Sequence, residues 1–203
     1  MPKLSPIAQK ILRLARKQGV LRPRDLAEQD LPADYLWRLE KSGHLIRLDR
    51  GLYMRADADF SAHISLAEVG KRIPDGVICL VSALSFHELT LQLPHEVWIA
   101  VRPGRYHAKM EHLKLRYVHL SGASLTEGIE THRIDGVNLQ VYSPAKTVAD
   151  CFKFRNQLGM ETVLQALRQG LEEQRFSPAE LDRFACINRV DRVMRPYLEV
   201  LLV

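Results

Sequence analysis

The stretch that decides the fold runs from Arg22 to Arg55 and reads RPRDLAEQDLPADYLWRLEKSGHLIRLDRGLYMR. Its beginning predicts a short helix over residues 25–29, because Pro23 suits the first turn of a helix. Pro32 then ends that helix, since the residue before a proline is pushed out of the α region. A second helix is expected over residues 33–42. Two short helices in this order are typical of a helix-turn-helix.

The rest of the stretch predicts a two-stranded β-ribbon. Gly43 suits the left-handed cap that ends the second helix. Residues 45–48 and 52–54 then form two short strands, and Gly51 supplies a positive φ in the turn between them. Val20 and Leu21 are expected to form a short extended link that pairs with this ribbon. The whole pattern is that of a winged helix-turn-helix.

A further helix precedes this stretch and completes a module of residues 1–55. Ser5 suits the N-cap of a helix over residues 6–18, and Pro6 suits its first position. Apolar side chains recur on one face of this helix and are expected to form its buried stripe; they are Ile7, Ile11, Leu14 and Ala15.

The excess of positive charge belongs to this module. Residues 1–55 hold 12 Lys or Arg against 6 Asp or Glu, whereas residues 56–203 hold 17 against 18. The whole chain carries a formal net charge of +5. A basic module beside a nearly neutral remainder favours a nucleic acid as its partner.

The basic side chains of the module lie where binding to double-stranded DNA needs them. A recognition helix reads base edges with polar and cationic side chains, and a wing approaches the backbone or the minor groove. In the second helix we expect Leu36 and Leu39 to pack inward, and Trp37 to belong to the core rather than to the contact surface. The alternative is a small helical module with solvated basic side chains. The expected DNA contacts are Arg22, Arg24, Tyr35, Arg38, Lys41, Arg47, Arg50 and Arg55.

Beyond a polar linker of residues 56–62, the pattern predicts a mixed α/β domain over residues 63–203. The fold class is therefore α+β, with helices gathered at the end of the chain. The clearest hairpin joins residues 128–134 to 137–142 at Asp135-Gly136. Other expected strands cover residues 77–80, 96–101 and 113–120. The expected helices cover residues 64–72, 82–89, 144–154, 159–174, 178–185 and 190–203, and Ser82 is expected to cap the second of them. Lys146 and Asp150 lie one helical turn apart and are able to form an ion pair.

Length and composition exclude several classes of protein. No apolar run approaches the roughly 20 residues that span a bilayer, and the N-terminus lacks the apolar segment of a signal peptide. The three cysteines, Cys79, Cys151 and Cys186, match neither a disulfide framework nor a zinc site. We therefore expect a cytoplasmic protein without contact to a membrane.

A second group of basic residues surrounds His107, His112 and His119. The histidine spacing matches no common zinc pattern, and no glycine-rich phosphate loop or carboxylate–lysine cluster is present. We therefore expect no enzyme activity, no metal and no cofactor. Two interpretations stay open for these basic residues: a second basic surface that contacts a partner, or a loop that is merely solvated. The surface would comprise Arg102, Arg105, Lys109, Lys114 and Arg116.

Three stretches together resemble the AbiEi-type antitoxins and transcriptional regulators of type IV (abortive-infection) toxin–antitoxin systems. The first is residues 45–53, LIRLDRGLY. The second is residues 82–84, SAL, with the Leu-Thr pair at 89–90, Pro94 and the strand at 97–101. The third is residues 143–152, SPAKTVADCF. This sequence departs from the family at Glu88, where glycine often precedes the Leu-Thr pair.

The resemblance implies an N-terminal winged-helix domain and a C-terminal antitoxin domain. It implies a repressor of its own operon that counters a nucleotidyltransferase-type toxin. We expect this repressor to bind inverted repeats near its own promoter as a monomer or weak dimer. Two alternatives stay open. One is a regulator whose C-terminal domain only dimerises or senses a ligand, without a toxin partner. The other is an enzyme acting on nucleic acid.

Overall fold

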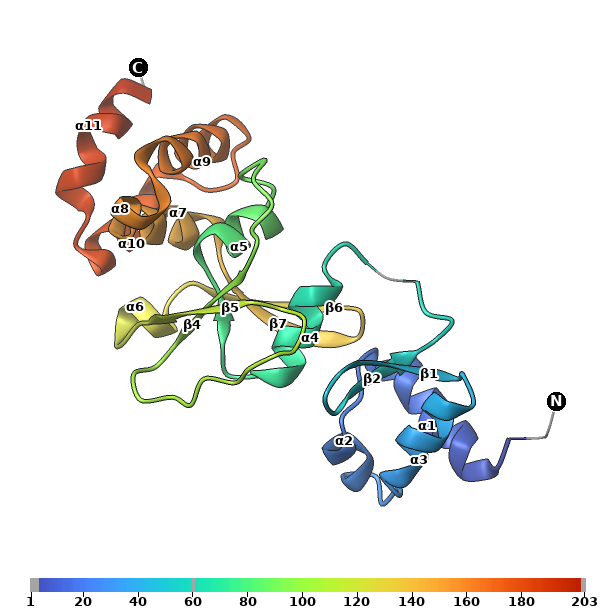
Figure 1. Ribbon diagram of the computed structural model, residues 1–203. Coiled ribbons are helices and arrows are strands. Elements are labelled where there is room, and N and C mark those ends of the chain that lie inside the picture. The colour runs from blue at the N-terminus through green and yellow to red at the C-terminus, as the bar shows by residue number, and fades with distance from the viewer. Residues whose placement is uncertain (1–3, 60, 202–203) are drawn as a thin grey trace. The chain divides into compact units, whose positions relative to one another are not determined.

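The computed structural model describes residues 4–59 and 61–201 (Figure 1). Its helices and strands form a mixed α+β fold, as expected from the sequence. The chain divides into two compact units. The first comprises the chain up to Pro74 together with Ala108–Leu113 and His132–Leu139, and the second comprises Asp75–His107, Lys114–Thr131 and the chain from Gln140 onward.

The first unit begins with three helices. The first, α1 (Pro6–Gln18), starts where its cap predicts, because the Ser5 hydroxyl accepts a hydrogen bond from the Ala8 amide at 3.2 Å. The short α2 (Pro23–Ala27) begins two residues before the predicted helix, and α3 (Asp34–Lys41) follows it. Inward side chains of the three helices share one apolar core; its buried members include Ile11, Ala15, Leu26, Leu36 and Leu39.

An antiparallel ribbon follows the helices. Its strands are β1 (Leu45–Asp49) and β2 (Leu52–Arg55). The link before α2 joins this ribbon, since the amides of Leu21 and Tyr53 each donate to the other's carbonyl, at 2.7 and 2.9 Å. The predicted pairing of this link is therefore confirmed, and the ribbon is tied to the end of α1.

The first unit contains more than the predicted module of residues 1–55. The helix α4 (Ile64–Arg72) and the tip of a later hairpin belong to the same unit. Buried Val20 and Leu52 pack with Ala67 of α4 and Val137 of the hairpin. Apolar side chains of the basic module are therefore covered by segments that follow it in the chain.

A five-stranded sheet has the order β5-β4-β3-β7-β6, and its strands belong to the second unit except at the hairpin tip, His132–Leu139. The pair β3–β4 is antiparallel, whereas β4–β5 and β3–β7 are parallel. The predicted hairpin is present, and both turn residues, Asp135 (φ 47°) and Gly136 (φ 79°), adopt the positive φ that a type I′ turn needs. The strands are β3 (Val77–Ile78), β4 (Val97–Val101), β5 (Leu115–His119), β6 (Ile129–Ile134) and β7 (Val137–Tyr142).

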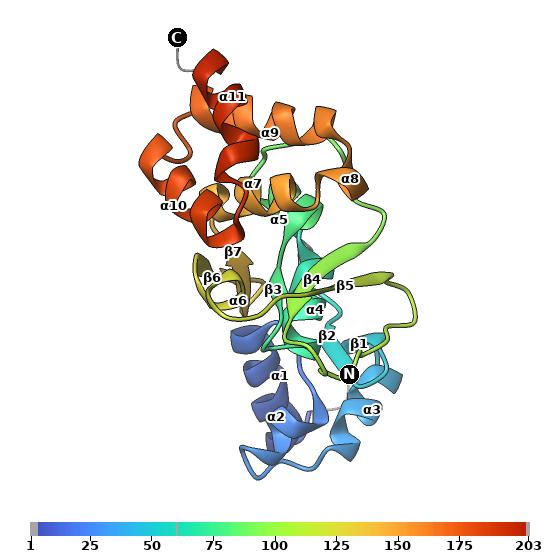
Figure 2. The ribbon, with the colours of Figure 1, turned by 90° about the vertical axis from the view of Figure 1, so that its left-hand side faces the viewer.

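Helices gather beside this sheet at the end of the chain (Figures 1 and 2). At their centre, α7 packs against α5, α9 and α10. The helices of this unit are α5 (Leu80–Phe86), α6 (Ala123–Thr126), α7 (Pro144–Lys153), α8 (Arg155–Leu158), α9 (Met160–Glu172), α10 (Pro178–Asn188) and α11 (Asp191–Leu201).

The start of α5 differs from the prediction. Cys79 precedes the helix, and Ser82 lies inside it rather than at its cap. The buried Ser82 hydroxyl instead accepts a hydrogen bond from the Trp98 amide of β4 at 3.0 Å. The Ser82 hydroxyl therefore binds a backbone amide of a neighbouring strand instead of capping the helix as the sequence had predicted. Among the described residues, no helix is long and apolar enough to cross a membrane.

Candidate nucleic-acid interface

One face of α3 is exposed and carries charged and aromatic side chains. Leu36 and Leu39 are buried, as predicted from their spacing. The exposed side chains fall at the helical spacing i, i+3, i+4 and i+7; they are Asp34, Trp37, Arg38 and Lys41. Of the contacts predicted on α3, Arg38 and Lys41 are exposed, whereas Tyr35 is half-buried and packs against the apolar core of the first unit.

The prediction for Trp37 is wrong. Its side chain is 57% exposed, and it lies in the middle of the exposed face. Each step along a helix turns by about 100°, so a residue next to Leu36 points away from the direction shared by Leu36 and Leu39. Aromatic character suggested burial, but helical position decided the outcome.

The basic side chains of α3 are held by their neighbours. The Arg38 guanidinium lies 2.8 Å from the Asp34 carboxylate, one turn away, and 5.1 Å from the centre of the half-buried Tyr35 ring. The Lys41 ammonium lies 5.3 Å from the centre of the Trp37 ring. Both pairs are exposed, so they orient the cations rather than remove them from contact with a partner.

Arg72 of α4 holds the turn between β1 and β2 in place. The Arg72 guanidinium donates to the Arg50 carbonyl at 2.7 Å and lies 3.6 Å from the buried Asp49 carboxylate. Asp49 in turn accepts the Arg50 amide at 2.5 Å and the Glu111 amide at 3.3 Å. The Arg50 side chain is thereby left exposed on an anchored turn, together with Arg47 of β1.

A second buried carboxylate belongs to α4. Glu68 is 3% exposed, and its carboxylate lies 2.9 Å from the His112 imidazole. Burial raises the pKa of Glu68, the nearby Asp49 raises it further, and His112 opposes both effects. The two buried carboxylates, Asp49 and Glu68, are therefore contacted by the basic side chains of Arg72 and His112.

Arg22 serves the interior of the first unit more than its surface. Its guanidinium donates to the Lys71 carbonyl at 2.7 Å and lies 3.3 Å from Asp25. The Lys71 ammonium approaches the same buried carboxylate at 2.8 Å. Arg22 and Lys71 thus join α2 to α4 through Asp25. Its place among the predicted DNA contacts stays a prediction, but its geometry is that of a structural residue.

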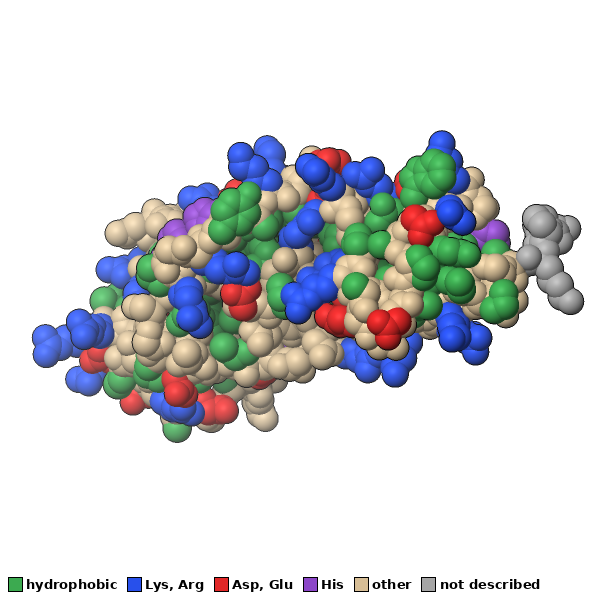
Figure 3. Space-filling model, turned by 90° about the horizontal axis from the view of Figure 1, so that it is seen from below, with side chains coloured by type: hydrophobic (Ala, Val, Ile, Leu, Met, Phe, Trp, Pro, Cys, Tyr) green, Lys and Arg blue, Asp and Glu red, His purple; other side chains and the backbone are tan. Residues whose placement is uncertain are grey.

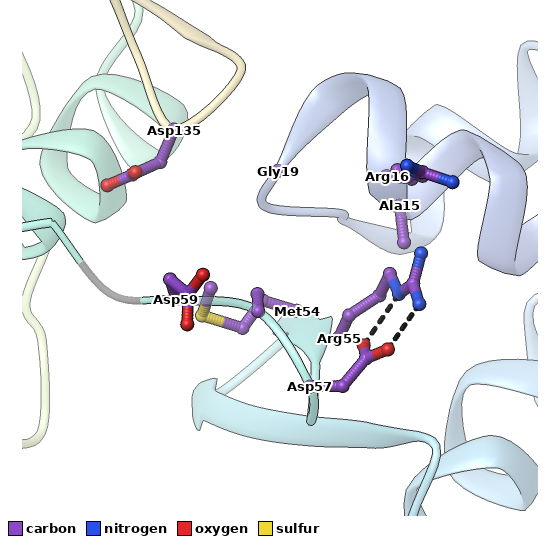
Figure 4. Close-up of a pocket in the computed structure, with 9 residues that line it drawn as sticks. Ala15, Arg16, Gly19, Met54, Arg55, Asp57, Asp59 and Asp135 are labelled. Atoms are coloured by element: carbon purple, nitrogen blue, oxygen red, sulfur yellow. Dashed lines mark hydrogen bonds and ion pairs between the residues drawn. The ribbon is translucent and has the colours of Figure 1, made fainter.

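Arg55 lies at the rim of a pocket of about 480 Å³, where it forms a two-point ion pair with Asp57 (Figure 4). That hydrogen-bonded pair lowers the pKa of Asp57. Asp59 and Asp135 also line the pocket, so its surface is not a cationic one. Arg24 is likewise paired, with Glu28 at 3.2 Å, but both of these side chains are well exposed.

The residues of the second basic group predicted from the sequence are divided between the two units. Lys109 belongs to the first unit, and the other four residues belong to the second. Arg105 pairs with Asp75, and Arg116 pairs with Glu96 at 2.9 Å while its guanidinium stacks over a tryptophan ring. Arg102 and Lys114 are exposed. In the view of Figure 3, acidic and apolar side chains lie among the Lys and Arg side chains.

The histidines of this region stack rather than cluster around a site. The His107 ring stacks on Tyr117 at a centroid distance of 4.1 Å, and its Nε2 lies 3.0 Å from Nε2 of His119. Within residues 4–59 and 61–201, no three His, Cys, Asp or Glu side chains come together as metal ligands. His112 instead contacts Glu68.

The sequence missed two positions that shape the candidate interface. Trp37 was assigned to the core, and Arg72 was not considered. The helical positions of Leu36 and Leu39 in α3 would have predicted that Trp37 is exposed. Nothing in the sequence near Arg72 indicates its contact with the ribbon, because the two lie more than twenty residues apart.

Comparison with known proteins finds a family match for the first part of the chain. Residues 9–56 match the family described as "Transcriptional regulator, AbiEi antitoxin", which confirms the resemblance over this stretch. The crystal structure of the RV2827C protein from Mycobacterium tuberculosis is similar to this chain, with a TM-score of 0.55 at 16% sequence identity. The similarity covers 90% of this chain and 72% of that chain, and it shows the fold alone. No curated protein sequence matches significantly.

Proposed function

We propose that the first unit binds double-stranded DNA as a winged helix-turn-helix module. In this proposal α3 is the recognition helix in the major groove, and the β1–β2 ribbon is the wing that meets the backbone. The observation that carries it is the exposed face of α3, where Trp37, Arg38 and Lys41 are exposed opposite a buried apolar face. The family match over residues 9–56 supports the same assignment.

The anchored ribbon supports the proposal independently. A wing must present its cations to phosphates without a large ordering cost on binding. The contacts of Arg72 with Arg50 and Asp49 hold the turn before DNA arrives. Arg47 and Arg50 then act as phosphate contacts, while Arg38 and Lys41 face the groove. The family description further supports our proposal that the chain is a transcriptional autorepressor that binds inverted repeats near its own promoter.

The test of DNA binding is a salt titration with the full chain. Fluorescence anisotropy of a labelled duplex from its own promoter should show tight binding at low salt. Affinity should fall by about 100-fold for a fourfold rise in salt if about four phosphates are contacted, because their counterions are released. Absence of binding at low salt, or affinity that does not change with salt, would contradict the proposal.

We also propose, on the strength of the family match, that the chain is a cytoplasmic antitoxin that counters a nucleotidyltransferase-type toxin. It acts in this role by binding and not by catalysis, through residues within 63–203. The test is co-expression with a nucleotidyltransferase gene adjacent to its own. Growth should be rescued by the full chain, whereas rescue by residues 1–62 alone would show that the second part is dispensable. If no adjacent toxin is countered, a regulator with a dimerising or sensing second domain replaces this proposal.

A further inference from the structure

Trp37 is an exposed aromatic side chain with a fixed position on α3. The chain has two tryptophans; Trp37 is 57% exposed, and Trp98 is 6% exposed. Leu36 and Leu39 bury the opposite face of α3, so the helix cannot turn Trp37 inward without exposing both. Single exposed apolar residues are common at protein surfaces. The neighbours of Trp37 are what distinguish it.

One cation of the exposed face lies near the Trp37 ring, and a second is directed to the Tyr35 ring. Lys41 lies one turn after Trp37, with its ammonium 5.3 Å from the ring centre, and Arg38 is the next residue along the helix. Asp34 is the acidic member of the same face and is already paired with Arg38. An exposed apolar ring beside an exposed ammonium suits a partner that offers both an apolar group and a nearby anionic group.

The major groove of DNA has that chemistry. Phosphates border the groove, and thymine contributes a C5-methyl group, an apolar feature that distinguishes A·T pairs there. We propose that Trp37 is a specificity-determining residue that packs on a thymine methyl group while Lys41 reaches a flanking phosphate. This inference rests on the proposed binding of double-stranded DNA and adds the base that is read. The cations beside the ring favour DNA over an apolar protein partner.

Tryptophan fluorescence tests the contact directly in the full chain. The probe is the tightest-binding duplex selected from a random-sequence pool, with a label for anisotropy. Acrylamide quenching is measured with and without saturating duplex, and emission of Trp37→Phe is subtracted to isolate Trp37. We expect DNA to protect Trp37 from quenching several-fold, while Trp98 is already shielded.

Variants and modified duplexes test the role in specificity. Trp37→Ala should weaken binding to the selected duplex by about tenfold or more, whereas Trp37→Phe should retain most of the affinity. Uracil in place of one thymine removes only the methyl group; it should weaken the wild-type complex and leave the Trp37→Ala complex unchanged. Leu91→Ala, which truncates an 89% exposed apolar side chain in the second unit, is the matched control and should bind as wild type.

Each contrary result would overturn one specific part of the inference. If the duplex binds but Trp37 stays open to acrylamide, or if Trp37→Ala binds as wild type, the inference fails and DNA binding stands. If Trp37→Ala weakens binding but no uracil substitution does, the thymine assignment fails. Protection of Trp37 that grows with protein concentration, in the absence of DNA, would identify a protein contact instead. If the wild-type chain binds no duplex, the proposed function fails together with this inference.

Discussion

Lys146 and Asp150 form an ion pair that is closed off from solvent inside the second unit. The Lys146 ammonium lies 2.6 Å from Asp150 Oδ2, and their side chains are 0% and 1% exposed. Asn188 donates to the same carboxylate at 2.7 Å, and the Tyr142 ring lies 4.2 Å from the ammonium. The sequence predicted a pair across one helical turn, but it did not indicate that the pair is buried.

Breaking this pair should destabilise the protein strongly. In Asp150→Asn the shape is kept, but the Lys146 charge loses its counter-ion in the interior. We expect a loss of about 3–5 kcal/mol in the free energy of unfolding, measured by urea denaturation. Lys153→Met is the control, because Lys153 lies exposed on the same helix and should change stability by no more than about 0.5 kcal/mol. Equal stability of both variants would show that Lys146 reaches solvent or another partner.

Gly19 and Gly43 provide a matched test of packing in the first unit. Both have a positive φ, 69° and 73°, but a Cβ on Gly19 would lie 1.4 Å from the Asp135 carbonyl oxygen, whereas one on Gly43 would meet nothing within 4 Å. Gly43→Ala should therefore cost only the backbone strain, about 1 kcal/mol. Gly19→Ala should cost clearly more, because the hairpin tip must move. Similar melting temperatures of the two variants would argue against this approach of hairpin and α1.

Glu88 occupies a position that favours glycine. Its φ is 59° and its side chain is exposed. Its backbone carbonyl accepts a hydrogen bond from Gln169 at 2.8 Å and its backbone amide donates to the Ser85 carbonyl at 3.2 Å, and both contacts are available to a glycine. Glu88→Gly should therefore stabilise the protein by about 0.4–1 kcal/mol by relieving the left-handed conformation. Glu88→Ala keeps the Cβ and should stay close to wild type. A lower unfolding midpoint for the glycine variant would contradict this account.

Glu68 should make stability depend on pH. Burial raises its pKa in the folded protein, so the folded state binds this proton more tightly than the unfolded state does. Its contribution is fully present below the unfolded pKa and is lost as the pH rises through the folded pKa. Glu68→Gln removes this titration, so its stability relative to wild type should rise as the pH increases across that window. Chemical denaturation at a series of pH values measures the difference, and a constant difference would refute it.

Arg38 and Arg50 should affect DNA binding in different ways. Arg38→Ala should weaken binding to the preferred duplex by about 1–3 kcal/mol and reduce the preference over random sequence, because base contacts specify. Arg50→Ala should weaken both duplexes alike, because phosphate contacts carry no direct sequence information.

The controls for these two variants are stability and a distant arginine. Both side chains are exposed, so melting temperatures should stay near that of wild type. Arg183→Ala truncates an exposed arginine of the second unit and should bind DNA as wild type does. Unchanged binding of both Arg38→Ala and Arg50→Ala would remove α3 and the ribbon as the DNA-binding surface.

Local patterns in the sequence determined most of the secondary structure. Ser5 and Pro6 start α1 where expected, the turn at Asp135-Gly136 joins the two predicted strands, and Leu36 and Leu39 set the buried face of α3. These features depend on neighbours within one or two turns of the chain, so their signals are complete in a short stretch. The charge of residues 1–55 was likewise read from the sequence, and the family resemblance followed from three short stretches.

The tertiary structure decided which charged groups serve the interior. Asp49 and Glu68 are charged residues of a kind usually found at the surface, yet both are buried in the first unit. Arg72 contacts the Asp49 carboxylate and His112 contacts the Glu68 carboxylate, and both partners come from other segments of the chain. Ser82 lost its expected role as a cap in the same way, to a backbone amide of β4. Burial of a polar group depends on partners that are distant along the chain, and a local pattern does not contain them. The sequence by itself therefore determined most of the elements and the basic module, and the fold alone decided which of its cations are exposed and which serve the interior.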